Sequence, residues 1–162
     1  MRIDTVEELI EDIFSVPDDA LANAEEWINV TNQLAVAIGT ANDLLIIQTY
    51  SERYEGCDPY LQICYEEDGA MTIEAVSNRF LHPKLSVDAQ NTMHELGWEL
   101  SDEPNLPNYF KFLHKEDAIP LKVAQLFADT LRNAYGITTS DTIEIRTGRG
   151  VWSNHDSQSS LE

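Results

Sequence analysis

Two cysteines, Cys57 and Cys64, are the side chains of this sequence best suited to nucleophilic chemistry. A cysteine nucleophile needs a histidine base and a third group that orients it, and the candidate bases are His82, His94 and His114. Cys57 lies in a turn-like segment and Cys64 in the middle of a strand-like segment, and no motif connects either one to a histidine. We therefore interpret Cys57 as a loop residue and Cys64 as a small apolar-like filler. A cysteine-dependent enzyme is the weakest of the alternatives.

Metal and nucleotide chemistry have no motif in this sequence. The histidines lack His-x-x-x-His spacing, and the cysteines do not form the Cys-x-x-Cys pair of a zinc site. The segment 66–69 lacks the alternating oxygen ligands of a calcium loop. No GxSxG, Walker-type or GxGxxG sequence occurs. The sequence therefore predicts no metal, no cofactor and no enzymatic activity.

Aromatic residues gather in the strand-like segments and indicate a binding surface instead. Most of them are expected in the core, but an antiparallel sheet that is covered by helices on one face leaves its other face to solvent or to a partner. Tyrosine and tryptophan bind well while tolerating water. The candidate partner-binding residues are Tyr50, Tyr65, Trp98 and Tyr109.

Hydrophobic periodicity predicts the elements that must position these residues. Apolar residues at helical spacing predict helices over residues 5–14, 17–38, 86–96 and 117–135. Strand-forming residues predict strands over residues 43–50, 60–67, 70–77, 98–100, 109–112 and 142–146. Ser86 or Asp88 is expected to cap the third helix, and Asp117 the fourth, with Pro120 in its first turn.

The order of these elements predicts an α+β fold with an antiparallel sheet. Asp68-Gly69 between two strand-like runs is a hairpin signal, so residues 43–77 are expected to form a three-stranded meander. In the second strand, Leu61 and Ile63 share one face and Gln62 and Cys64 the other. Residues 98–112 are expected to add a hairpin to the sheet.

The net charge of −19 excludes one class of partner and favours another. Residues 1–70 carry 16 acidic and 2 basic residues, a net charge of −14, and residues 71–162 carry 13 and 8, a net charge of −5. Such a surface repels nucleic acid and anionic lipid, so we expect neither as a partner, whereas a basic protein segment is favoured. The one basic cluster, Arg146 to Gly150, is interpreted as a solvated connector, with an anion site as the alternative.

The chain is expected to form a single α+β domain over residues 1–147. No apolar run approaches the roughly 18 residues of a membrane span, the N-terminus does not resemble a signal peptide, and two cysteines are too few for a disulfide framework. We therefore expect a cytoplasmic protein. Residues 148–162 are rich in Gly, Ser, Asn and Gln and are expected to be disordered, and Leu161-Glu162 is interpreted as a cloning scar.

The sequence resembles a known family in two places. Leu96-Gly97-Trp98 precedes a proline-containing turn, and Asn108-Tyr109 opens the next strand. The closing helix ends in TLRNAYGI, residues 130–137. With the order of elements, these features are similar to the type III secretion chaperones and YbjN-like proteins, and to the actinobacterial peptide-binding chaperones called TY-Chap. The resemblance covers roughly residues 20–137.

The resemblance implies a non-enzymatic chaperone-like module that binds a segment of a partner protein, often as a homodimer. It implies no particular binding residue. The alternative is a dimeric YbjN-like regulator of stress or cell state that has no client peptide. The two hypotheses differ in what they predict, because the first requires a partner segment and the second only a stable interface between copies.

Overall fold

The structure is a computed structural model that describes residues 18–155 of the 162-residue chain. Within this range the chain forms one six-stranded sheet and three α-helices, the last of which continues as a short π-helix. The helices are α2 (Asp18–Thr40), α3 (Val87–Glu95), α4 (Pro120–Asp129) and the π-helix η1 (Thr130–Ala134). The strands are β1 (Leu44–Tyr50), β2 (Tyr60–Tyr65), β3 (Met71–Ala75), β4 (Tyr109–Leu113), β5 (Thr142–Thr147) and β6 (Gly150–Ser153). The helix predicted over residues 5–14 lies outside the described residues.

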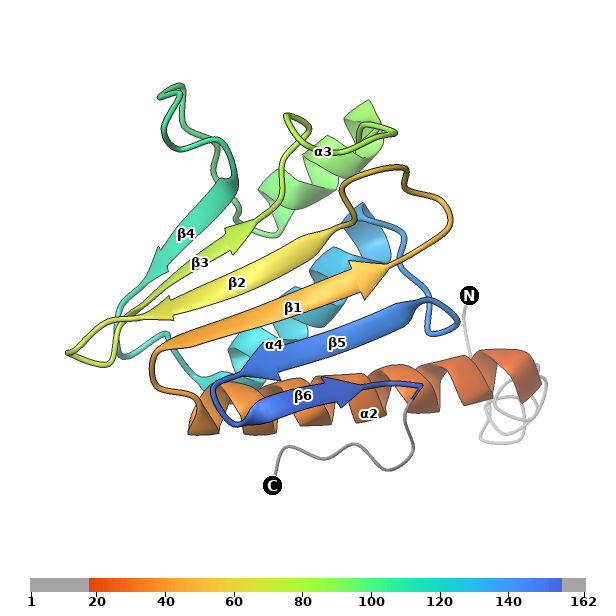
Figure 1. Cartoon of the computed structure of the whole chain (residues 1–162), viewed down its shortest axis with the longest axis horizontal. Coiled ribbons are helices and arrows are strands. Elements are labelled where there is room, and N and C mark those ends of the chain that lie inside the picture. Colours follow the sequence, from red (N-terminus) through yellow and green to blue (C-terminus); the bar gives the residue numbers. More distant parts are fainter. Residues whose placement is uncertain (1–17, 156–162) are drawn as a thin grey trace, which may run out of the picture.

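The strands follow the order β4-β3-β2-β1-β5-β6 across the sheet, and every pairing is antiparallel (Figure 1). The predicted meander of β1, β2 and β3 is confirmed. Its second turn depends on Gly69, whose φ of +89° is costly for other residues. Beside it, the Asp68 carboxylate accepts a hydrogen bond from the Ala70 N–H at 3.0 Å. The α+β class with an antiparallel sheet is therefore confirmed.

The predicted hairpin of residues 98–112 forms only in part. Strand β4 pairs along its length with β3, whereas residues 98–100 contact it through a single bridge between Glu99 and Phe110. The reason lies in Trp98, whose ring is buried in the core and donates a hydrogen bond from Nε1 to Thr130 Oγ1 at 3.0 Å. This contact directs the chain toward η1 and away from a longer pairing with β4.

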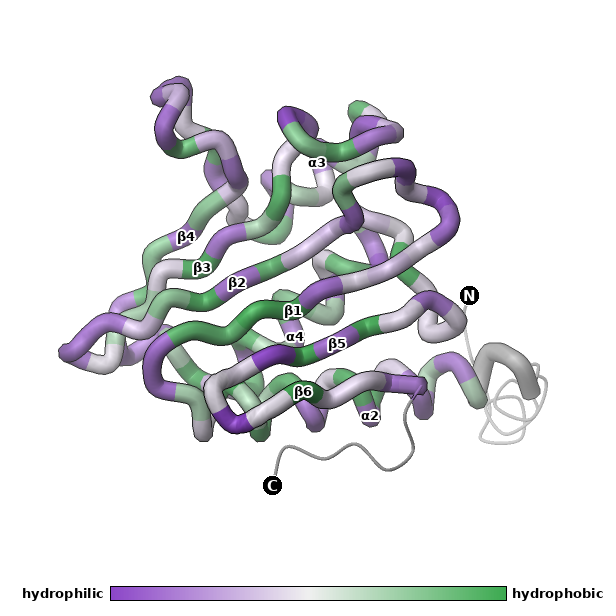
Figure 2. Tube along the Cα trace, in the orientation of Figure 1, coloured by the Kyte–Doolittle hydropathy of each residue, from purple (hydrophilic) through white to green (hydrophobic). Residues whose placement is uncertain are grey.

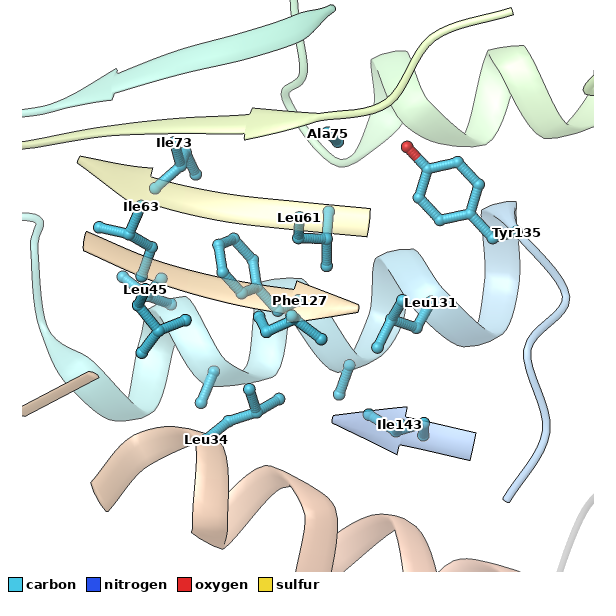
Figure 3. Packing of buried hydrophobic residues seen from close by; sticks show 14 of the residues in the cluster. Leu34, Leu45, Leu61, Ile63, Ile73, Ala75, Phe127, Leu131, Tyr135 and Ile143 are labelled. Atoms are coloured by element: carbon cyan, nitrogen blue, oxygen red, sulfur yellow. The ribbon is translucent and has the colours of Figure 1, made fainter. Parts of the chain in front are cut away.

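The helices cover one face of the sheet, and the core lies between the two layers. In Figure 1 they lie behind the strands, and α2 packs against α4. Figure 3 shows Leu45, Leu61 and Ile63 of the sheet facing Phe127 of α4. All four side chains are fully buried. Of the helices in residues 18–155, none is long and apolar enough to cross a membrane.

The helix boundaries follow local signals with one exception. Ser86 caps α3, because its Oγ accepts a hydrogen bond from the Ala89 N–H at 3.1 Å. Helix α4 begins at Pro120, where a missing N–H costs nothing. The prediction of Asp117 as its cap is wrong, because Ile119 holds that position and no side-chain hydrogen bond is made there.

The expectation of disorder from Gly148 is wrong for the first residues of that segment. Residues 148 and 149 form a two-residue turn, and Gly150–Ser153 pairs with β5 as strand β6. The turn relies on Gly150, whose φ is +138°. Trp152 is only 4% exposed and joins the core, and this apolar anchor outweighs the polar composition around it. Residues 156–162 lie outside the described residues.

Candidate functional site: the open face of the sheet

The face of the sheet that the helices leave uncovered, called here the open face, is the candidate functional site. Alternation along the strands decides its members: in β1, Leu45 and Ile47 are buried against the helices, whereas Leu44 and Ile46 point the other way. The strand register assigns to the open face Leu44, Ile46, Gln48, Tyr50, Tyr60, Gln62, Cys64, Thr72, Glu74, Phe110, Phe112, Thr142, Glu144, Arg146, Val151 and Ser153.

The open face carries several exposed apolar side chains that no described element covers. Leu44, Tyr50, Phe112 and Val151 expose between 41% and 50% of their surface. Ile46 and Phe110 are partly exposed beside them. Figure 2 shows that β1 brings a run of hydrophobic residues to the middle of the sheet. Neighbouring exposed and partly exposed apolar side chains such as Leu44 and Ile46 on β1 are candidates for a site of interaction.

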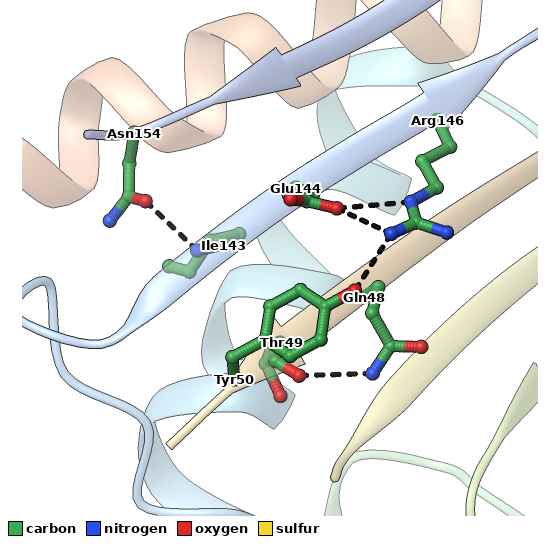
Figure 4. A network of polar contacts seen from close by, with 7 residues as sticks. All are labelled: Gln48, Thr49, Tyr50, Ile143, Glu144, Arg146 and Asn154. Atoms are coloured by element: carbon green, nitrogen blue, oxygen red, sulfur yellow. Dashed lines mark hydrogen bonds and ion pairs between the residues drawn. The ribbon is translucent and has the colours of Figure 1, made fainter. Parts of the chain in front are cut away.

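Of the three charged residues on the open face, Arg146 and Glu144 form an ion pair, and Glu74 accepts a hydrogen bond from an uncharged amide. Arg146 donates from Nε and Nη2 to the Glu144 carboxylate at 3.0 and 2.6 Å, and from Nη2 to the Tyr50 hydroxyl at 2.7 Å (Figure 4). The Gln62 amide donates to the Glu74 carboxylate on the next strand. A protein with a net charge of −19 therefore presents one face with little free charge, which lowers the cost of drying it on contact with a partner.

A shallow pocket of about 540 Å³ lies at one end of the open face. The α2–β1 loop, the first residues of β1 and the β5–β6 turn enclose it. Its lining residues are Thr40, Ala41, Asn42, Asp43, Leu44, Ile46, Arg146, Thr147, Gly148 and Arg149. The pocket therefore combines the apolar side chains of Leu44 and Ile46 with two arginines.

The two candidate partner-binding tyrosines of β1 and β2 lie on opposite sides of the sheet. Tyr50 is on the open face, where its hydroxyl accepts the hydrogen bond from Arg146. Tyr65 is on the helix-covered side, and its hydroxyl donates to the Ile38 carbonyl at the end of α2 at 2.8 Å. Burial raises the pKa of Tyr65 to about 12, so this hydroxyl keeps its proton at neutral pH. Tyr65 thus ties the sheet to α2.

Trp98 and Tyr109, two of the candidate partner-binding residues, are buried in the core and do not lie on the open face. Trp98 is 2% exposed and Tyr109 is 1% exposed. Trp98 stacks on Phe127, with the ring centroids 6.3 Å apart, and Tyr109 faces the helices because β4 places it beside Ala75 of β3. The aromatic residue type alone does not tell whether a side chain lies in the core or on the surface. The side of the sheet to which the side chain points decides this.

Neither cysteine has a histidine partner among the described residues. Both thiols are free and partly exposed. Within residues 18–155, neither forms a hydrogen bond with a histidine, and the one described bond, from Cys57 Sγ to the Asp58 carbonyl, is 3.6 Å long. Burial, and then the nearby carboxylates, raise the pKa of Cys57 and of Cys64. No group of three or more His, Cys, Asp or Glu residues is placed to hold a metal ion in this part of the chain.

Both thiols are expected to alkylate slowly at neutral pH. A raised pKa leaves less of the reactive thiolate at pH 7 than in free cysteine. The alkylation rate should rise as the pH increases toward and past about 8.5, the ordinary pKa of a cysteine thiol. Iodoacetamide labelling followed by mass spectrometry measures each rate, with the urea-unfolded protein as the control. Labelling of either cysteine faster than free cysteine at pH 7 would revive the enzyme hypothesis.

Most residues of the open face could not be identified from the sequence alone. Leu44, Ile46, Phe112 and Val151 are not among the predicted binding residues, and for the cluster of Arg146 and Arg149 a solvated connector is predicted ahead of an anion site. One signal was present: β1 is apolar at consecutive positions, so an apolar residue must point to each face wherever it lies in the sheet. Val151 had no such signal, because its strand was not expected.

One of three comparisons with known proteins found a match. A family model described as TY-Chap3, T3SS (YopN, CesT) and YbjN peptide-binding chaperone 3, matches residues 20–148. These residues contain most of the sheet and all the described helices except the first two residues of α2. Searches of the curated proteins and of the solved structures found no match. The predicted resemblance is confirmed, and the chain belongs to the TY-Chap3 family of peptide-binding chaperones.

Proposed function

We propose that this protein is a non-enzymatic module that holds an extended segment of a partner protein across the open face of its sheet. The observation that carries the proposal is the set of apolar side chains on that face: Leu44 and Ile46 on β1, and Val151 on β6, with Arg146 of β5 between Ile46 and Val151. Membership of a peptide-binding chaperone family supports it. We also propose a cytoplasmic location, which the two free cysteines support.

An extended segment suits this surface for a geometric reason. Side chains of an extended chain alternate, so every second residue can face the sheet. Each large apolar side chain that is fully buried contributes about 1.5–3 kcal/mol, and two or three such contacts offset part of the cost of ordering the segment. The open face offers the apolar contacts, and its paired charges leave few groups to desolvate.

Methyl-resolved NMR tests the location of binding without altering the protein. Twelve-residue peptides selected from a random display library serve as the probe. We expect the methyl signals of Leu44, Ile46 and Val151 to shift on titration, while Ile28 and Leu121 on the helices stay in place. Shifts confined to the helix residues would overturn the proposal, and so would a library that yields no binding peptide.

A basic partner should associate faster at low salt. The net charge of −19 attracts cationic segments over several ångströms, and the Debye length shortens from about 30 Å at 0.01 M salt to about 8 Å at 0.15 M. We expect the association rate constant of a basic selected peptide to fall by at least about tenfold over this range. Stopped-flow fluorescence measures it, with a neutral peptide as the control. An association rate that does not depend on salt would contradict the expectation of a basic partner.

A homodimer without a client is the second candidate, and the outer edge of β6 is the observation that favours it. Among the described residues, no strand pairs with this edge. The register places Val151 opposite Arg146 and Trp152 opposite Ile145. Because Asn154 N–H bonds to the Ile143 carbonyl, alternation directs the backbone groups of Val151 and Ser153 outward. Two copies can therefore join their sheets at this edge.

Val151→Pro tests this edge, because proline removes an outward N–H and leaves the pairing with β5 intact. If β6 joins two copies, sedimentation velocity should show a dimer for the unaltered protein and a monomer for the variant. Circular dichroism should show the same sheet content in both. A dimer that survives the substitution contradicts pairing through β6, and a monomeric unaltered protein contradicts the dimer itself.

A further inference from the structure

We propose that the pocket at the end of the open face selects partner segments in which an acidic side chain, Asp or Glu, lies two residues from a bulky apolar one. This inference rests on the proposed function and adds the chemistry of the bound segment. It assigns the basic cluster of the β5–β6 hairpin to recognition of a carboxylate. If the cluster were only a solvated connector, nothing would explain why Arg146 and Arg149 line a pocket together with residues of β1.

The pocket differs in charge from the rest of the molecule. Arg146 and Arg149 are two of only 10 basic residues in the chain, and both line this pocket, against one carboxylate, Asp43. Because Arg146 is paired with Glu144, the remaining charges of the lining are Arg149 and Asp43, which sum to zero in a protein whose net charge is −19. Complementary local charge fixes which residue of a partner sits where, even when the whole molecule repels that charge.

The guanidinium groups of Arg146 and Arg149 each have N–H donors without a hydrogen-bond partner among the described residues. Arg149 is exposed, and within residues 18–155 its guanidinium forms no hydrogen bond or ion pair; only its backbone N–H is engaged, with Thr147 Oγ1 at 3.1 Å. Arg146 uses Nε and Nη2 for Glu144 and Tyr50. Nη1 of Arg146 has no hydrogen-bond partner among the described residues, and Figure 4 shows it pointing away from Glu144. Arg146 is therefore held in place with one nitrogen free, which lowers the cost of ordering it on binding.

The apolar side chains of the pocket set the spacing. Leu44 and Ile46 point to the same side of β1 and line the pocket, and Arg146 lies directly opposite Ile46 on β5. In an extended segment, side chains two residues apart lie on the same side, about 6.6–6.8 Å from each other. A segment that places an apolar side chain over Leu44 and Ile46 can thus bring the next side chain on that side to the guanidinium groups.

Selection from a random twelve-residue peptide library, at about 0.15 M salt to screen the overall charge, tests this chemistry. Three full-length proteins are compared: the unaltered protein, Arg149→Glu, and Lys122→Glu as the matched control. Lys122 is exposed on α4 near strand β4, at the edge of the sheet opposite β6, and both substitutions change the net charge by −2. We expect Asp or Glu to be enriched two positions from an apolar residue with the unaltered protein and the control, and lost with Arg149→Glu.

Fluorescence anisotropy gives the size of the effect. A selected peptide that contains Glu should bind Arg149→Glu about threefold to tenfold more weakly than the unaltered protein, because one exposed ion pair is lost and a like-charge contact is added. The same peptide with Gln in place of Glu should bind both about equally. Two outcomes would overturn this inference and leave the proposed function standing. In the first, the selected peptides show no preference for Asp or Glu; in the second, they show that preference equally with Arg149→Glu. Failure to select any peptide would overturn both the inference and the proposed function.

Discussion

Replacing Trp98 with alanine is expected to lower the free energy of unfolding by about 3–5 kcal/mol. The indole is 2% exposed, stacks on Phe127 of α4 and donates a hydrogen bond to Thr130 at the start of η1. Alanine leaves a cavity where the chain between α3 and β4 meets the helix layer. Urea unfolding followed by circular dichroism measures the loss.

A milder substitution separates packing from hydrogen bonding. Trp98→Phe keeps an aromatic ring against Phe127 and removes only the Nε1 donor and part of the volume. It should lower the free energy of unfolding by less than Trp98→Ala does, and the lost hydrogen bond should account for about 0.5–1.5 kcal/mol of that decrease. The phenylalanine variant should also bind selected peptides as tightly as the unaltered protein, because Trp98 does not reach the open face. A Trp98→Ala cost below about 1 kcal/mol would contradict its place in the core.

Replacing Ile46 with glutamine is expected to weaken peptide binding by about 10-fold to 100-fold. The side chain lies near the middle of the open face, between Gln62 on β2 and Arg146 on β5. A fully buried isoleucine contributes about 1.5–3 kcal/mol, and glutamine must also give up its own hydration. Glutamine carries no charge, so the long-range attraction or repulsion of the partner is unchanged. Anisotropy of a labelled, selected peptide measures the change.

Ile28→Gln is the matched control for this substitution. Ile28 is 60% exposed on α2, on the helix side of the molecule, and the chemical change is the same. We expect its affinity for the peptide to equal that of the unaltered protein. Both variants should keep their unfolding free energy to within about 1 kcal/mol, because both side chains have contact with solvent. Equal affinities for all three proteins would show that the segment binds elsewhere.

The hydrophobic periodicity of the sequence was sufficient to predict most helices and strands and most of the strand pairings. Alternation in β2 predicted that Leu61 and Ile63 share a face, and both are fully buried. The Asp68-Gly69 turn and the Ser86 cap were predicted correctly because their signals involve residues close together in the chain. The family resemblance followed from a few motifs that the fold requires.

The candidate site was predicted only as a possibility: an uncovered face of a sheet with aromatic residues on it. Tyr50 alone among the four candidates proved to lie on the open face, whereas Tyr65, Trp98 and Tyr109 contribute to packing. Residue type did not decide between these outcomes, because tyrosine and tryptophan suit both a core and a wet interface.

The sequence by itself therefore determined the class of the fold, the family and the surplus of negative charge. The tertiary structure decided which side of each strand meets the helices, and it brought β5 beside β1 although about ninety residues separate them. That pairing placed Arg146 and Arg149 next to Leu44 and Ile46 and made one pocket of two segments far apart in the chain. Local patterns describe neighbours in sequence, whereas a binding surface consists of neighbours across a sheet, and their register forms only when the core packs.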